Sequence, residues 1–149
     1  MKKIIAALAA AAALTLVTAC GTGAPAAITS HGEVTVFAPP LGGQTVRDAY
    51  PDIASGGQVT VTNSAGKVVG TGTLLYSLGG TKAALTKATA GTGMTATEML
   101  AFVALYKFTV KVPAGLARYG IKVGKGRGTI YFSARQMKQG PVLSLGSMS

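Results

Sequence analysis

Acidic side chains are scarce in this chain of 149 residues, which has four Asp or Glu residues against 14 Lys or Arg residues and a formal net charge of +10. Tryptophan is absent, and cysteine and histidine occur once each. Acid–base catalysis and metal binding both need clusters of carboxylate, imidazole or thiolate groups, which so few residues do not supply. We therefore expect a protein without enzymatic activity, metal site or cofactor.

Long hydrophobic runs are also missing. The longest one, from Ile4 to Val17, has 14 residues, whereas a membrane-spanning helix needs about 20. It follows Lys2 and Lys3, and this order is typical of a secretory signal. The run ends in Val-Thr-Ala-Cys at Cys20, which resembles the lipobox of bacterial lipoproteins. That resemblance implies cleavage before Cys20 and a diacylglycerol, with acyl chains such as palmitate, on its sulfur.

The expected location is the outer face of the cell membrane, because two acyl chains anchor a protein stably and one does so only marginally. Two alternatives stay open: an exported protein with one free thiol, and a cytoplasmic protein with an apolar amino-terminal helix. Without Lys2 and Lys3 the chain keeps 12 basic and four acidic residues, a net charge of +8. This excess favours anionic partners such as phospholipid or wall polymers, and export argues against nucleic acid.

The expected organisation is a signal peptide over residues 1–19, a lipidated cysteine with a flexible tether over 20–31, and one domain over 32–149. Glycine-rich turns separate short runs of Val, Thr and Tyr, which is typical of all-β proteins. We predict an immunoglobulin-like or transthyretin-like β-sandwich of about seven short strands.

The clearest local pattern is a hairpin, with alternating residues 58–62, an Asn-Ser-Ala-Gly turn and a returning strand over 67–75. Gly70 and Gly72 in the returning strand predict a bulge or a close backbone approach. Further strands are expected at 33–37, 102–112, 117–123, 129–132 and 141–145. Short helical turns are expected over 96–100 and 133–139, and loops over 44–57 and 77–94, the latter with a weak strand near 83–86.

The sharpest functional hypothesis concerns basic residues near the carboxyl-terminal end. If residues 113–116 form a four-residue turn, Lys111 lies opposite Arg118 and Lys107 opposite Lys122 on one polar face. Lys125 and Arg127 follow in the next turn. We therefore expect a basic stripe for an anionic lipid or wall polymer, comprising Lys107, Lys111, Arg118, Lys122, Lys125 and Arg127. The simpler interpretation is a solvated face that keeps the domain soluble.

Other polar groups favour structural interpretations. His31 is expected to be an exposed histidine on the tether, and Asp52 to bond its own backbone in a turn. The segment 124–128, Gly-Lys-Gly-Arg-Gly, lacks the spacing of a phosphate-binding loop and is expected to be a mobile hairpin turn.

Several segments resemble small uncharacterised actinobacterial lipoproteins. They include Gly57-Gln58-Val59-Thr60-Val61-Thr62, Tyr119-Gly120-Ile121-Lys122-Val123, and Arg127-Gly128 followed by Tyr131-Phe132-Ser133. The resemblance implies a surface-anchored sandwich and no activity. A binding module for an anionic envelope component or a protein partner is the first expectation. An adaptor subunit of a membrane complex is the alternative, with an apolar patch expected at Val103 and Leu105. Related phage-encoded proteins would raise a role in superinfection exclusion.

Overall fold

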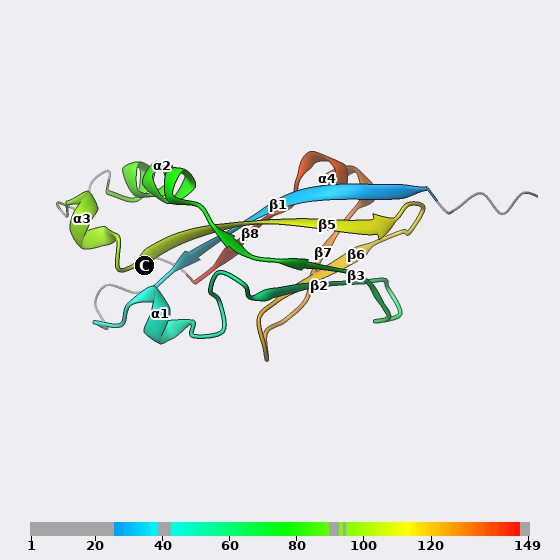
Figure 1. The fold of residues 1–149 in the computed structure, drawn as a ribbon, viewed down its shortest axis with the longest axis horizontal. Helices are drawn as coiled ribbons and strands as arrows, with labels where there is room; N and C mark the ends of the chain where they lie inside the picture. Colours follow the sequence, from blue (N-terminus) through cyan, green and yellow to red (C-terminus); the bar gives the residue numbers. More distant parts are fainter. Residues whose placement is uncertain (1–25, 39–42, 90–92, 94, 147–149) are drawn as a thin grey trace, which may run out of the picture.

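The computed structural model describes residues 26–38, 43–89, 93 and 95–146. Their strands form two four-stranded sheets around one main hydrophobic core (Figure 1). Sheet A has the order β4-β5-β1-β8, and sheet B has the order β3-β2-β6-β7. The strands are β1 (Ala27–Phe37), β2 (Gln58–Thr62), β3 (Val68–Thr73), β4 (Leu75–Tyr76), β5 (Val103–Pro113), β6 (Tyr119–Val123), β7 (Ile130–Phe132) and β8 (Val142–Leu145). All neighbours are antiparallel except β1 and β8. The expected all-β class is confirmed.

The two longest strands, β1 and β5, form the centre of sheet A because both alternate in polarity. On β5 every side chain at an even position from Ala104 to Val112 is buried, while Lys107, Thr109 and Lys111 are exposed. Opposite the Phe108 ring lies Gly32 of β1, where an added Cβ would overlap the ring. The missing side chain of Gly32 thus leaves room for an aromatic ring in the core.

The predicted hairpin is β2–β3, and its turn is held by the Asn63 side chain, which accepts hydrogen bonds from the N–H groups of Ala65 and Lys67. The predicted close approach is also confirmed. A Cβ on Gly70 would lie 2.7 Å from the Lys111 carbonyl oxygen, and one on Gly72 would lie 2.6 Å from that of Thr109. Backbone contact between β3 and β5 therefore closes one side of the interior.

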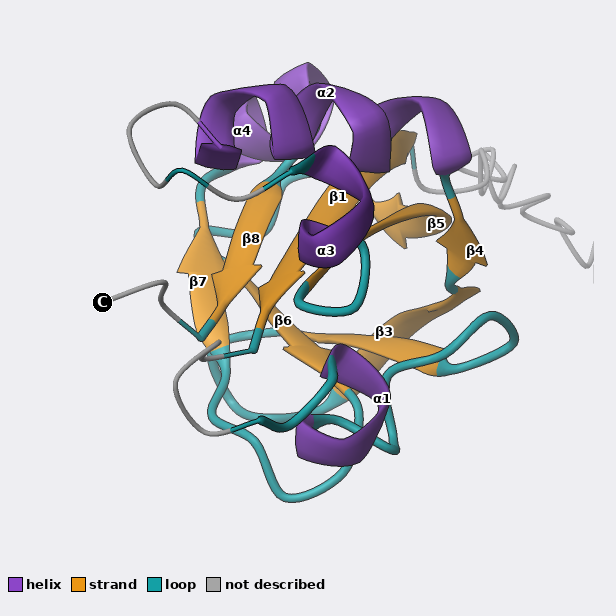
Figure 2. Ribbon diagram, turned by 90° about the vertical axis from the view of Figure 1, so that its left-hand side faces the viewer, coloured by secondary structure: helices purple, strands orange, loops and turns teal. Residues whose placement is uncertain are grey.

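Four helices are present among the described residues: α1 (Val46–Ala49), α2 (Leu78–Thr89), α3 (Ala96–Met99) and α4 (Ala134–Gln139). Capping boxes begin three of them, at Thr45, Thr95 and Ser133. The helical turns near 96–100 and 133–139 are as predicted. Figure 2 shows α2 over the face of sheet A that is turned away from sheet B.

The prediction of a loop with a weak strand at 83–86 is wrong, because α2 covers residues 78–89. Thr81 attaches the helix to β5 by accepting the Leu105 N–H at 3.0 Å. Leu85 packs with Met99 and Val103 in a second, smaller apolar cluster. The apolar patch expected at Val103 and Leu105 is therefore covered by the chain's own helices, and both residues are buried.

Two further expectations are wrong. The tether was expected to reach residue 31, but β1 begins at Ala27 and pairs with β5 along its whole length. Ile28 and Ser30 are buried, and the Ser30 hydroxyl donates to the Met137 carbonyl at 2.7 Å. The start of β1 contains small residues such as Ala27 and Ser30, so its alternation of buried and exposed positions is not visible as an alternation of hydrophobicity. The loop expected over 44–57 contains α1, whose capping box was not recognised. The expected tether over residues 20–25, with Cys20, lies outside the described residues.

The expected pairing of residues 107–111 with 118–122 is also wrong, because β5 belongs to sheet A and β6 to sheet B. After Pro113 the chain crosses from one sheet to the other instead of forming a hairpin. The Tyr119 hydroxyl donates to the Pro113 carbonyl at 2.8 Å and holds this crossing in place. Tyr119 is fully buried, and burying this ring between the sheets is the physical reason for the crossing.

Candidate functional site

The predicted basic stripe is divided between the two sheets. Lys107 and Lys111 lie on the outer face of β5, and Lys122 lies on β6 opposite Thr60 of β2. Arg118 directly precedes β6, and the remaining two residues lie in the loop between β6 and β7. The repulsive cross-strand pairs that defined the stripe are therefore not formed.

The Arg127 side chain and the Lys125 backbone, in the loop between β6 and β7, both contact Asp52. The Arg127 guanidinium contacts both Asp52 carboxylate oxygens, at 2.7 and 3.3 Å, and lies 4.6 Å from the centre of the Tyr50 ring. The Lys125 N–H donates to the same carboxylate at 2.9 Å. The hydrogen bond from Arg127, with the one from Lys125, lowers the Asp52 pKa despite partial burial. The loop expected to be mobile is therefore fastened to Asp52.

The ion pair of Lys107 is weaker. Its Nζ lies 3.7 Å from Glu33 Oε1, and about half of each side chain is exposed. Exposed pairs of this kind contribute at most about 1 kcal/mol. His31 lies on β1, not on a tether, and its Nδ1 is 3.0 Å from the Thr109 hydroxyl.

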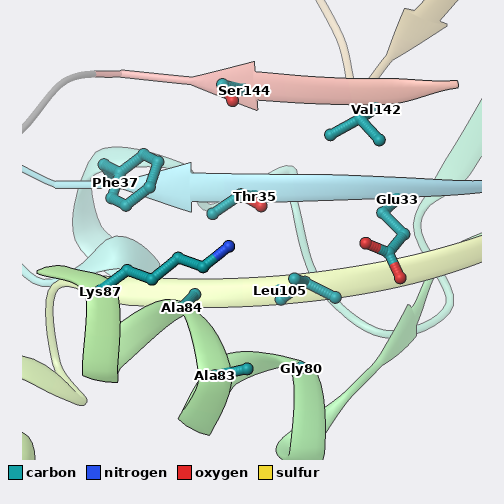
Figure 3. Close-up of a pocket in the computed structure, with 10 residues that line it drawn as sticks. All are labelled: Glu33, Thr35, Phe37, Gly80, Ala83, Ala84, Lys87, Leu105, Val142 and Ser144. Carbon is teal, nitrogen blue, oxygen red and sulfur yellow. The ribbon is translucent and has the colours of Figure 1, made fainter.

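A groove on the outer face of sheet A was not predicted. Its volume is about 700 Å³, which lies within the range of small-molecule sites. Figure 3 shows β1 as its floor, with α2 on one side and β8 on the other. The lining residues are Glu33, Thr35, Phe37, Gly80, Ala83, Ala84, Lys87, Leu105, Val142 and Ser144.

The groove depends on how α2 is turned. Thr81 and Leu85 face the sheet and are buried, whereas Gly80, Ala83, Ala84 and Lys87 line the groove with the spacing of one helix face. Three of these four side chains are small, so the helix leaves space above β1. At Gly80 an added Cβ would lie 2.7 Å from Leu105 Cδ2, so a side chain there would crowd the groove wall.

Charge is distributed unevenly along the groove. Glu33 at one end has Lys107 as its partner. Lys87 extends from the last turns of α2 toward β1 (Figure 3) and has no ionic or hydrogen-bonding partner among the described residues. The uncompensated charge in the groove is therefore positive, and the apolar surface beside it comes from Phe37, Leu105 and the two alanines.

One signal in the sequence could have revealed this site. Residues 82–88, Lys-Ala-Ala-Leu-Thr-Lys-Ala, consist mainly of strong helix formers. This composition indicates a helix, and the apolar residues at the start of β5, which follow it, indicate that the helix packs on the sheet. The neighbouring glycines and threonines favoured a loop instead.

Within the part of the chain that the structure describes, no three His, Cys, Asp or Glu residues are grouped as a metal site would require. No helix in that part has both the length and the apolarity needed to cross a membrane. Comparison of the chain with models of protein families, with curated proteins and with solved structures gives no match.

Proposed function

We propose that this chain is a lipid-anchored, non-enzymatic protein of the cell envelope, held on the outer face of the membrane through Cys20. The proposal includes kinship with small actinobacterial lipoproteins and an immunoglobulin-like or transthyretin-like type of sandwich. It is supported by the order of Lys2, Lys3, an apolar run and Val-Thr-Ala-Cys. Transfer of a labelled palmitate analogue to the chain, abolished by Cys20→Ser, is the expected result for the anchor.

The domain is a binding module for an anionic envelope component, and the groove on sheet A is its binding site. The observation that carries this proposal is the Lys87 amine, which has no partner in the described part of the chain and lies beside apolar lining residues. A ligand that suits both features is an amphiphile with one acyl chain and a carboxylate or phosphate. Its chain would contact Phe37 and Leu105, and its anionic group would lie at Lys87, because a second anion at Glu33 would be repelled.

Displacement of a fluorescent fatty acid measures this binding. Lys87→Glu reverses the charge and is expected to weaken binding at least tenfold, and Ala84→Phe is expected to do the same by filling the groove. Lys82→Glu is the matched control, because Lys82 is exposed on the same helix and does not line the groove. Equal affinity for the Lys87 and Lys82 variants would contradict the proposal, as would equal affinity for an uncharged ligand of the same length.

An adaptor subunit is the second candidate, favoured by a different surface. Leu75, Tyr76 and Leu78 lie at the β4 edge of sheet A and at the start of α2, with 63%, 45% and 56% of their surface exposed. Exposed apolar side chains on a sheet edge favour pairing with another protein. Crosslinking in the envelope from position 75 tests this, and a defined partner lost with Leu75→Lys plus Leu78→Lys would support it.

A further inference from the structure

Four segments distant in sequence meet at one end of the molecule, the end where β1 begins. Ala27 of β1 lies opposite Pro113 at the end of β5, and the Tyr119 hydroxyl at the start of β6 bonds to Pro113. The turn between β2 and β3 lies there too, since Thr62 pairs with Gly120 of β6. Figure 1 shows this end on the right, where β1 begins. We call it the anchor end.

The anchor end is basic. Lys67 lies in the turn between β2 and β3, Lys111 lies opposite Thr29 of β1, and Arg118 directly precedes β6. All three residues are exposed. None of the three side chains has an acidic partner among the described residues.

All four acids of the chain lie elsewhere, and each has a local role. Asp48 and Glu98 cap α1 and α3, and the hydrogen bonds from Thr45 and Thr95 lower the pKa of these two carboxyls. Asp52 holds Arg127. Glu33, which pairs with Lys107, lies six residues along β1 from Ala27, a distance of roughly 20 Å at the rise of a strand. The positive charge of the anchor end is therefore uncompensated.

Covalent geometry limits how far this end can be from a lipid on Cys20. Ala26 is six residue steps along the chain from Cys20, and six steps can span no more than about 21 Å in any conformation. Charges on a protein surface attract an anionic membrane within about 10 Å at 0.1 M salt. An anchored domain can therefore bring Lys67, Lys111 and Arg118 into the headgroup region, whereas α3 lies at the opposite end of the long axis (Figure 1).

We propose that the anchor end docks on anionic phospholipid headgroups through Lys67, Lys111 and Arg118, so that the domain stands on the membrane with its long axis away from the surface. This rests on the proposed lipid anchor and adds a second, electrostatic attachment to it. Basic residues near a surface act additively. Replacing all three is expected to lower the ratio of docked to undocked domains roughly 100-fold.

The experiment uses the processed chain with Cys20 acylated, purified and inserted into vesicles. Cys20 is the only cysteine, so an added cysteine carries the only reactive thiol. A fluorophore is attached at Ala65→Cys, in the β2–β3 turn, or at Thr97→Cys, in α3. Quenching by nitroxide groups on the headgroups, which requires near contact, is expected at position 65 and not at position 97. It is expected on phosphatidylglycerol vesicles at low salt and lost on phosphatidylcholine vesicles or at 1 M salt.

The combination Lys67→Gln, Lys111→Gln and Arg118→Gln is expected to abolish quenching at position 65. The matched control removes the same charge elsewhere, through Lys82→Gln, Lys122→Gln and Lys125→Gln, and is expected to leave quenching unchanged. Equal effects of the two combinations would overturn the proposal, as would equal quenching at positions 65 and 97. Loss of quenching when soluble poly(glycerol phosphate) is added at constant ionic strength would assign the surface to a wall polymer and overturn docking on lipid.

The anchor has its own readout. In the unaltered chain, reaction of Cys20 with a maleimide would show a free thiol. That result would overturn the lipid anchor and the docking arrangement that rests on it. An acylated Cys20 without position-dependent quenching would overturn docking alone and leave the proposed anchor intact.

Discussion

The two faces of sheet A are covered in different ways. On the inner face, aromatic and branched side chains such as Phe108 and Val110 pack against sheet B, and β3 approaches β5 closely enough that only glycine fits. On the outer face, α2 together with Met99 of α3 covers part of the strands, and α2 presents alanine and glycine to the space beside it. The inner face therefore determines the fold, while the incompletely covered outer face has room for a ligand.

The largest expected loss of stability comes from adding a side chain at Gly70, where β3 contacts β5 on the inner face. In Gly70→Val the new Cβ would lie 2.7 Å from the Lys111 carbonyl oxygen and 2.8 Å from Val112 Cγ1. Because neither neighbour is the mobile end of a long side chain, we expect a loss of about 3 kcal/mol in the free energy of unfolding. Urea denaturation measures it. Gly79→Ala in α2, where no atom lies within 4 Å of the added Cβ, is the control and should not destabilise. A Gly70 variant as stable as this control would contradict the close approach.

A smaller and more local effect is expected on the outer face. Leu85 of α2 is 2% exposed and packs with Met99 and Val103. Leu85→Ala should cost about 2 kcal/mol, at the lower end of the range for buried leucines. Hydrogen exchange is expected to quicken mainly in α2, because the main core does not include this cluster. Lys82→Ala, an exposed change on the same helix, should leave exchange unaltered. Uniform acceleration over both sheets would show that the two clusters unfold together.

The smallest expected effect on stability concerns the two ion pairs, Arg127–Asp52 and Lys107–Glu33. The Arg127 hydrogen bond lowers the Asp52 pKa below its unfolded value, so this pair contributes stability above about pH 4 that is lost as the pH falls through the folded-state pKa. We expect Asp52→Asn to cost about 1 kcal/mol at pH 7 and to reduce the loss of stability between pH 5 and pH 2.

Glu33→Gln is the comparison, because the Glu33–Lys107 pair is longer and more exposed. It is expected to change stability at pH 7 by less than about 0.5 kcal/mol. Melting temperatures over the acidic range measure both variants. A larger effect at Glu33 than at Asp52 would reverse the ranking of the two pairs.

Strands with clear alternation were predictable from sequence, and so were the helical turns α3 and α4, whereas α1 was missed although it too begins with a capping box. The β2–β3 hairpin, β5 and α4 fall in this group because their patterns are set by neighbours along the chain. The start of β1 and helix α2 were missed for a common reason. Alanine, threonine, serine and glycine at 27–31 and 78–89 have weak hydrophobic contrast, so burial there depends on partners such as Met137 and Leu105.

By itself, the sequence determined the excess of positive charge, the scarcity of groups for catalysis, the all-β class and the expectation of an anchor at Cys20. Only the tertiary structure decided which charges lie together. Pairing β5 with β1 and placing β6 in the other sheet divided the expected stripe, fastened Arg127 to Asp52 and left Lys67, Lys111 and Arg118 at one end. The physical reason is that alternation along a strand specifies which side chains are buried, whereas the choice of partner strand depends on packing between residues distant in sequence.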